Sequence, residues 1–207
     1  MMHESIPQTE YVQKVQETSE ALEFYVAPFC GDVFKSAVDK FPTFEILLSV
    51  PVYLDPESAF VSGGLNANGD IGIWIGQAEG LITTSMKSRI NERFKLPYDV
   101  LDQPDILFMP IILAHELGHV IQADPQFEGI FGKIDTNFVS PEADYEGYVQ
   151  SDLELNADYI AALIVGDTSF GSFVGIESPR DPPQSWREWG IVHPIPNTIA
   201  INTGHTT

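Results

Sequence analysis

The stretch Ile111–Ile121, which reads IILAHELGHVI, decides how the chain is organised. It predicts a helix that ends near Ala123, because Asp124 precedes a proline and is biased away from helical geometry. On such a helix His115 and His119 are four residues apart, so their side chains lie on one face, one turn from each other. Two imidazoles at that spacing can bind a single Zn²⁺ while the backbone stays helical.

Glu116 follows the first histidine directly. At that position a carboxylate can meet a metal-bound water and take its proton, which makes Glu116 a candidate general base. The alternative is structural: both histidines could be satisfied by backbone partners at a helix surface.

A catalytic zinc site needs a third protein ligand and one open position. A third histidine just downstream is ruled out, because Gln122 occupies the glycine position of that motif and no histidine follows within the next ten residues. The candidate is Glu154, on a helix predicted from Tyr148 to Val165 and ended by Gly166.

Asp158 lies four residues after Glu154, so the two carboxylates share a helix face. Asp158 could hydrogen-bond the free ring nitrogen of a ligating histidine, and the small Ala157 beside it would let the two helices approach closely. The alternative is that Glu154 and Asp158 lie on a solvated face; their apolar neighbours favour a face that is partly inward.

The motifs HELGH (115–119) and ELNAD (154–158) together resemble the gluzincin pattern, HExxH followed by ExxAD. Among gluzincins the chain is most similar to small cytosolic members, namely the minigluzincins, the M48-like peptidases and the ImmA/IrrE-type peptidases. The resemblance covers about residues 59–166. It implies an α+β, zincin-like metallopeptidase fold, in which a small twisted β-sheet packs on the HExxH helix and a glutamate helix follows.

The resemblance also implies roles for individual residues. Zinc would be bound by His115, His119 and Glu154, and Glu116 would act as general base and then as general acid in peptide hydrolysis. Members often supply a His or Tyr that stabilises the oxyanion. His193, in the stretch VHPIP (192–196), resembles their HPxP segment and is the predicted donor.

Tyr145 and Tyr148 are alternative donors, although surface or packing roles suit both. The start of the metal helix has two interpretations: Pro110 either kinks the helix or marks its start, and Asp102 or Asp105 could cap it.

We expect one catalytic domain over residues 1–207. Its parts are a helical scaffold (1–43, with helices at 9–30 and 31–41), a core (44–166) and an irregular tail (167–207). In the core we expect strands at 44–50, 52–54 and 70–76, a turn at Gly63-Gly64, a helix at 85–94 and a loop at 124–146. The glycines of segment 70–76 suit an edge strand approached by another backbone, although an ordinary sheet strand is equally compatible.

The composition is strongly acidic, with 30 Asp and Glu against 10 Lys and Arg and a formal net charge of −20. Such a surface repels phosphate backbones and anionic membranes, so we expect neither as a partner. Cys30 is the only cysteine, which excludes an intrachain disulfide, and residues 1–10 lack the features of a secretory signal. We therefore expect a cytoplasmic protein.

These observations predict a zinc-dependent peptidase whose substrate is a peptide or protein, docked along an edge strand. Two alternatives stay open: an interaction protein that keeps zinc as a structural element, and a protease specific for a single partner protein. The oligomeric state is not predicted.

Overall fold

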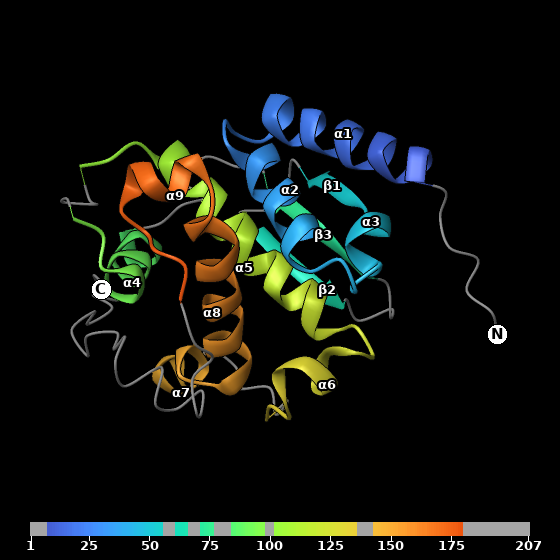
Figure 1. The fold of residues 1–207 in the computed structure, drawn as a ribbon. Coiled ribbons are helices and arrows are strands. Elements are labelled where there is room, and N and C mark those ends of the chain that lie inside the picture. The colour runs from blue at the N-terminus through green and yellow to red at the C-terminus, as the bar shows by residue number, and fades with distance from the viewer. Residues whose placement is uncertain are drawn as a thin grey trace.

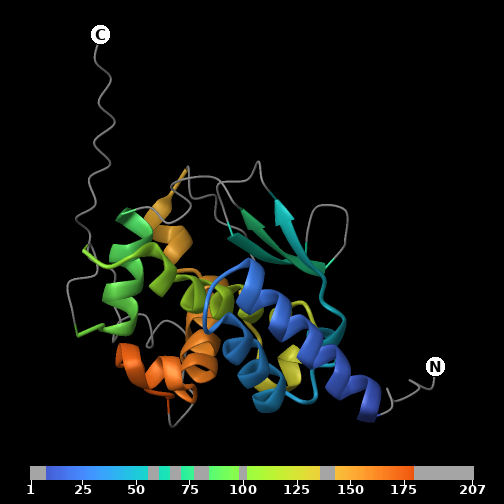
Figure 2. The ribbon, with the colours of Figure 1, turned by 90° about the horizontal axis from the view of Figure 1, so that it is seen from above.

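The computed structural model describes residues 8–55, 61–65, 71–76, 84–97, 102–135 and 143–179. The fold is α+β, with the described helices gathered on one side of a small three-stranded sheet (Figures 1 and 2). In chain order the elements are α1 (Gln8–Tyr25), α2 (Cys30–Lys40), α3 (Ile46–Ser49), β1 (Val52–Asp55), β2 (Val61–Leu65), β3 (Ile71–Gly76), α4 (Thr84–Phe94), η1 (Asp105–Leu107), α5 (Met109–Gln122), α6 (Phe127–Phe131), α7 (Tyr145–Val149), α8 (Asp152–Gly166) and α9 (Ser169–Val174).

The sheet has the order β1-β3-β2, so β3 is its central strand. It pairs in parallel with β1 and antiparallel with β2. The strand at 71–76 is confirmed, but its expected place at the edge is wrong. Its glycine Gly72 is covered by side chains rather than by another backbone, since the Trp74 and Tyr53 rings lie about where a Cβ would contact them, at 3.1–3.2 Å.

Strand β2 is the edge strand that lies against α5, and it contains the two glycines predicted to form a turn. That prediction is wrong. A Cβ on Gly63 would lie 2.6 Å from the carbonyl oxygen of Glu116, so the glycine is there because strand and helix are in backbone contact. Gly64 has a φ of 102° and lies against His119, which again favours glycine.

The segment Phe44–Val50 is not a strand: residues 46–49 form α3. Every third side chain of this segment is buried, namely Phe44, Leu47 and Val50, and this period belongs to a helical turn. A short continuous apolar run looks the same in sequence whether it forms a strand or a buried helix.

Helix α5 starts at Met109 with Pro110 in its first turn, so the proline marks the start of the helix and does not kink it. Neither Asp102 nor Asp105 caps α5, because the short helix η1 intervenes and Phe108 takes the N-cap position. The end at Gln122 agrees with the prediction.

The predicted helix 148–165 is two helices, α7 and α8, separated at Gln150 and Ser151. The Ser151 side chain accepts a hydrogen bond from the backbone N–H of Glu154 and caps α8. Gly166 ends α8 as expected, but its role is close approach: a Cβ there would lie 2.1 Å from the backbone N of Ser178.

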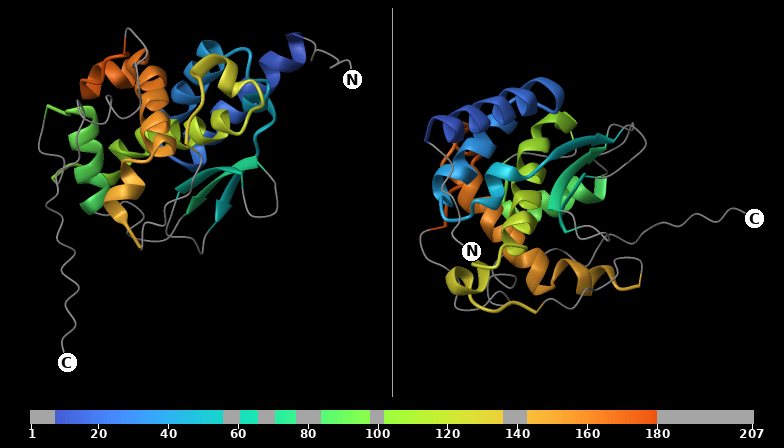
Figure 3. Two further views of the ribbon diagram at one scale, coloured as in Figure 1. Left: turned by 90° about the horizontal axis from the view of Figure 1, so that it is seen from below. Right: turned by 90° about the vertical axis from the view of Figure 1, so that its right-hand side faces the viewer.

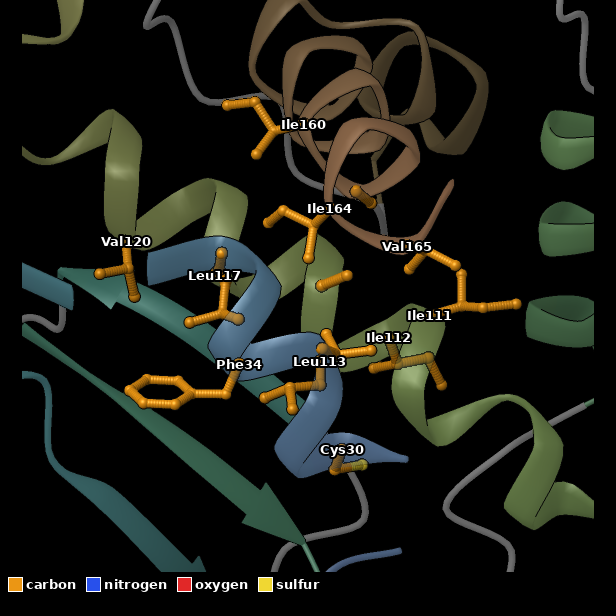
Figure 4. Packing of buried hydrophobic residues seen from close by; sticks show 14 of the residues in the cluster. Cys30, Phe34, Ile111, Ile112, Leu113, Leu117, Val120, Ile160, Ile164 and Val165 are labelled. Carbon is orange, nitrogen blue, oxygen red and sulfur yellow. The ribbon is translucent and has the colours of Figure 1, made fainter. Parts of the chain in front are cut away.

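The apolar side chains of α2, α5 and α8 meet in one buried cluster that also takes in the inner face of the sheet (Figure 4). Figure 4 shows Phe34 of α2 beside Leu113 and Leu117 of α5, with Ile160 and Ile164 of α8 beyond them. α1 lies across the outside of α2 (Figures 1 and 3).

Two segments expected to be irregular contain short helices. The loop 124–146 includes α6 and the start of α7, with residues 136–142 outside the described part of the chain, and the tail begins with α9. The two expected N-terminal helices and the helix at 85–94 are confirmed as α1, α2 and α4. Among the described residues, no helix has both the length and the apolar character needed to cross a bilayer.

Candidate metal centre

Helices α5 and α8 pack against each other through two small residues, Gly118 and Ala157. A Cβ on Gly118 would lie 2.9 Å from the Cα of Ala157 and 3.1 Å from its carbonyl oxygen. The backbones of α5 and α8 are therefore in direct contact, as we expected from the small side chain of Ala157. This contact brings His115 and His119 on α5 within reach of Glu154 on α8.

Donor atoms of three residues on these helices converge, and we call His115, His119 and Glu154 the donor triangle. The Nε2 atoms of His115 and His119 are 3.1 Å apart. Each lies 3.4 Å from a different oxygen of Glu154: Nε2 of His115 from Oε2, and Nε2 of His119 from Oε1. Tetrahedral zinc with bonds of about 2.0–2.1 Å has ligand atoms about 3.3 Å from one another, so the spacing of the three residues fits a zinc ion.

The other ring nitrogen of each histidine is held by a neighbour. Nδ1 of His115 donates to Oδ1 of Asp158 at 2.8 Å, the contact that the sequence predicted. Nδ1 of His119 donates to Oε1 of Gln122 at 2.8 Å. Both Nε2 atoms are thereby left for a metal, and such partners also fix the orientation of the rings.

Gln122 connects this arrangement to α8, because its amide donates to the carbonyl oxygen of Leu153 and to the side-chain oxygen of Asn156, both at 2.8 Å. Its role was not predicted, although its position three residues after His119 on the same helix is a readable signal. The position that holds a glycine in the zinc peptidases with a third histidine here holds the group that orients His119.

Two arginines from α4 complete the charged part of the site. A terminal nitrogen of Arg89 is 2.6 Å from Oε2 of Glu154, and Nε of Arg93 is 2.8 Å from Oδ2 of Asp158. Arg93 is fully buried and also donates to the carbonyl oxygen of Val149 at 3.0 Å. The sequence predicted only a charged helix; the signal was a pair of arginines four residues apart in a chain that has few cations.

The charges of the centre shift its titration. Burial opposes ionisation of Glu154 and Asp158, but the Arg89 guanidinium and the histidines outweigh it. The pKa of Glu154 is held well below its usual value and that of Asp158 is lowered to about 2. Burial also opposes the charged form of His115, yet Asp158 and Glu154 raise its pKa to about 10.

Glu116 is partly buried beside the donor cluster and lies under β2. Burial raises the pKa of its carboxyl, while the two histidines and a backbone hydrogen bond from Gly63 oppose that rise. A carboxylate with a raised pKa next to a metal site has the proton affinity that a general base needs.

The three candidate oxyanion donors have different positions. Tyr148 lies close enough to Glu154 for that carboxylate to act on its hydroxyl, and the Arg89 guanidinium lies 6.0 Å from the centre of its ring. Burial, the largest cause, and the charge of Glu154 raise the pKa of Tyr148, so the hydroxyl keeps its proton. Tyr145 is 37% exposed. His193 lies outside the described residues.

Comparison of the chain with protein-family models, curated protein sequences and solved structures finds no match.

Proposed function

We propose that this chain is a zinc-dependent peptidase of gluzincin type with a zincin-like fold. The observation that carries the proposal is the convergence of His115, His119 and Glu154: the two Nε2 atoms are 3.1 Å apart, and each lies 3.4 Å from one oxygen of the Glu154 carboxylate. The sheet against α5, and the glutamate helix after it, agree with the element order that the gluzincin likeness implies.

Zinc held by these three residues would supply a Lewis acid that acidifies water and polarises a peptide carbonyl. Three protein ligands leave a position open, which is the arrangement of a catalytic site and not of a closed structural one. Asp158 and Gln122 keep the histidine rings in the ligating orientation through Nδ1.

Glu116 is the proposed general base. It takes a proton from the attacking water and later returns it to the leaving amine. Its backbone is fixed by the contact with Gly63, and its carboxylate accepts the Gly63 N–H, so its position is defined before substrate binds. Its raised pKa gives the carboxylate a higher proton affinity than an exposed glutamate has.

Tyr148 is the described residue best placed to donate to the oxyanion. Its hydroxyl lies near the Glu154 carboxylate, and a raised pKa keeps it a donor. We propose Tyr148 for the role that the sequence assigned to His193.

The substrate would bind in an extended form along β2. In the described part of the chain β2 pairs only with β3, so its second edge has no strand partner. Gly63 and Gly64 of this strand lie against Glu116 and His119, and a peptide added here would run past the metal centre.

The test begins with metal content. Purified wild-type protein should contain one zinc per chain by elemental analysis, and Glu154→Ala should lose most of it. Glu128→Ala, which changes an exposed glutamate of α6, is the matched control and should keep its zinc. A wild type without zinc after supplementation would contradict the proposal.

Activity is tested on casein and on a mixed peptide library. Glu116→Gln should keep its zinc and lose cleavage, whereas Glu128→Gln should cleave like the wild type. Equal cleavage by Glu116→Gln and wild type would show that Glu116 is not the base, and would turn attention to a structural role for the metal.

A further inference from the structure

Helix α4 contributes two arginines to the carboxylates of α8, and neither belongs to the donor triangle. The Arg89 side chain is 17% exposed and that of Arg93 is fully buried. Arg89 approaches both carboxylates, at 2.6 Å from Oε2 of Glu154 and 3.6 Å from Oδ2 of Asp158. A guanidinium this well buried is retained only where it is paired, because an unpaired buried charge is strongly unfavourable.

The two oxygens of Glu154 have different surroundings. Oε1 lies 3.4 Å from Nε2 of His119. Oε2 lies at the same distance from Nε2 of His115, but it also accepts a hydrogen bond from Arg89 at 2.6 Å. This short, charge-assisted bond occupies one lone pair of Oε2 and draws negative charge from it, which disfavours a second bond from Oε2 to the metal.

The number of carboxylate oxygens bound to a metal determines how many of its coordination positions remain free for water. A carboxylate can bind through one oxygen or through both. With two histidines and one oxygen, zinc has three protein ligands and keeps a position for water; a second oxygen would occupy part of that space.

We propose that Arg89 is a positioning residue that reserves Oε2 of Glu154 and so limits this ligand to a single bond with the metal through Oε1. The inference rests on the proposed metal site. In this proposal α4 has a role at the metal, because its arginine keeps one coordination position open.

Arg89 is itself held in place. Its guanidinium lies 6.0 Å from the centre of the Tyr148 ring, and Arg93, one turn further along α4, anchors that helix to Asp158 and to the carbonyl of Val149. A bound dication repels the Arg89 guanidinium, but moving away would leave that guanidinium without its two carboxylates. The pairing should therefore persist when metal binds.

The test uses cobalt(II) in place of zinc, because the visible absorption of cobalt(II) reports its coordination number. Four-coordinate cobalt(II) absorbs several-fold more strongly than five-coordinate cobalt(II). Wild-type protein loaded with one cobalt should show the strong four-coordinate spectrum. In Arg89→Met, Glu154 is free to bind through both oxygens, and the absorption should fall several-fold at equal cobalt content.

Two further variants separate this effect from a general disturbance. Arg89→Lys keeps a charged donor and should keep the wild-type spectrum. Lys87→Met removes a cation from the same helix that pairs with Asp105, away from the site, and should also leave the spectrum unchanged. A four-coordinate spectrum in cobalt-loaded Arg89→Met would overturn the inference, while failure of the wild type to bind zinc or cobalt would overturn the metal site itself.

X-ray absorption of the zinc-loaded wild type gives a second answer that does not depend on a variant folding. A carboxylate bound through one oxygen places its carbon further from zinc than one bound through both. We expect the longer distance; the shorter one would contradict the role of Arg89.

Discussion

Gly118 of the HELGH helix and Ala157 of the glutamate helix are in backbone contact, with 2.9 Å between the position of a Gly118 Cβ and the Cα of Ala157. The donor triangle depends on this contact, because His119 follows Gly118 directly and Glu154 lies one turn before Ala157. The separation of the two helices is thus determined by the smallest side chains between them.

Gly118→Ala should therefore destabilise the fold and weaken zinc binding. Overpacking costs about 1–3 kcal/mol, which exceeds the roughly 1 kcal/mol that alanine gains over glycine within a helix. Denaturant unfolding and a chelator competition measure the two effects. The control is Gly129→Ala in α6, where a Cβ would meet nothing within 4 Å and only the helix gain is expected. Equal stability changes in the two variants would contradict the close contact.

Zinc binding should release protons. In the metal-free protein the pKa of His115 is raised to about 10, against the opposing effect of burial, by Asp158 and Glu154. His115 is then protonated at neutral pH, while the metal requires its neutral form. We expect about one proton released per zinc and an affinity that rises about tenfold per pH unit between about pH 7 and 9.

Calorimetry in buffers of different ionisation enthalpy counts these protons. The stability of the metal-free fold should depend on pH in the opposite direction to the zinc affinity. The raised pKa of His115 stabilises the folded state below the unfolded value of 6.5, and this contribution disappears as the pH rises towards 10. No proton release at pH 7 would show that Asp158 does not act on His115 in this way.

Asp158→Asn should weaken zinc binding about 10- to 100-fold, because the amide no longer provides the charge that orients and polarises His115. It should also destabilise the protein by about 3–5 kcal/mol, since Arg93 loses a buried partner. Asp105→Asn removes the exposed partner of Lys87 and should cost less than about 1 kcal/mol. Similar losses in both variants would contradict the buried network.

The same carboxylate should govern stability in acid. Burial raises the pKa of Asp158, but Arg89 and His115 lower it from 3.8 to about 2. A lowered pKa stabilises the fold above the unfolded value, and this contribution is lost as the pH falls from about 4 to about 2. Urea midpoints across that range should fall less steeply in Asp158→Asn than in the wild type.

Tyr148→Phe should lower kcat by on the order of 10²-fold with little change in KM, if the hydroxyl donates to the oxyanion in the transition state. Zinc content should be unchanged. Tyr145→Phe, which changes an exposed tyrosine of the same helix, is the matched control. A kcat that is the same in both variants would remove Tyr148 from the mechanism.

The sequence by itself determined features within single helices, namely which residues form the helix and which of them share a face. Two histidines four residues apart on a helix must share a face, and the apolar run around them predicts that helix without knowledge of the rest of the chain. The break before α8 had a local signal that the predicted helix 148–165 missed, because Ser151 and Glu154 stand at the spacing of a capping pair. The spacing of Glu154 and Asp158 likewise put both carboxylates on one face.

The tertiary structure decided every feature that depends on which elements meet. Nothing in residues 71–76 tells whether the strand lies at the centre or at the edge of the sheet, because order in a sheet depends on pairing between distant segments. The sequence predicted a turn at Gly63, whereas the structure shows that a glycine stands there because the backbone of Glu116 lies against it. Arg89 is 65 residues from Glu154, and only the packing of α4 beside α8 turned an ordinary charged helix into part of the metal centre.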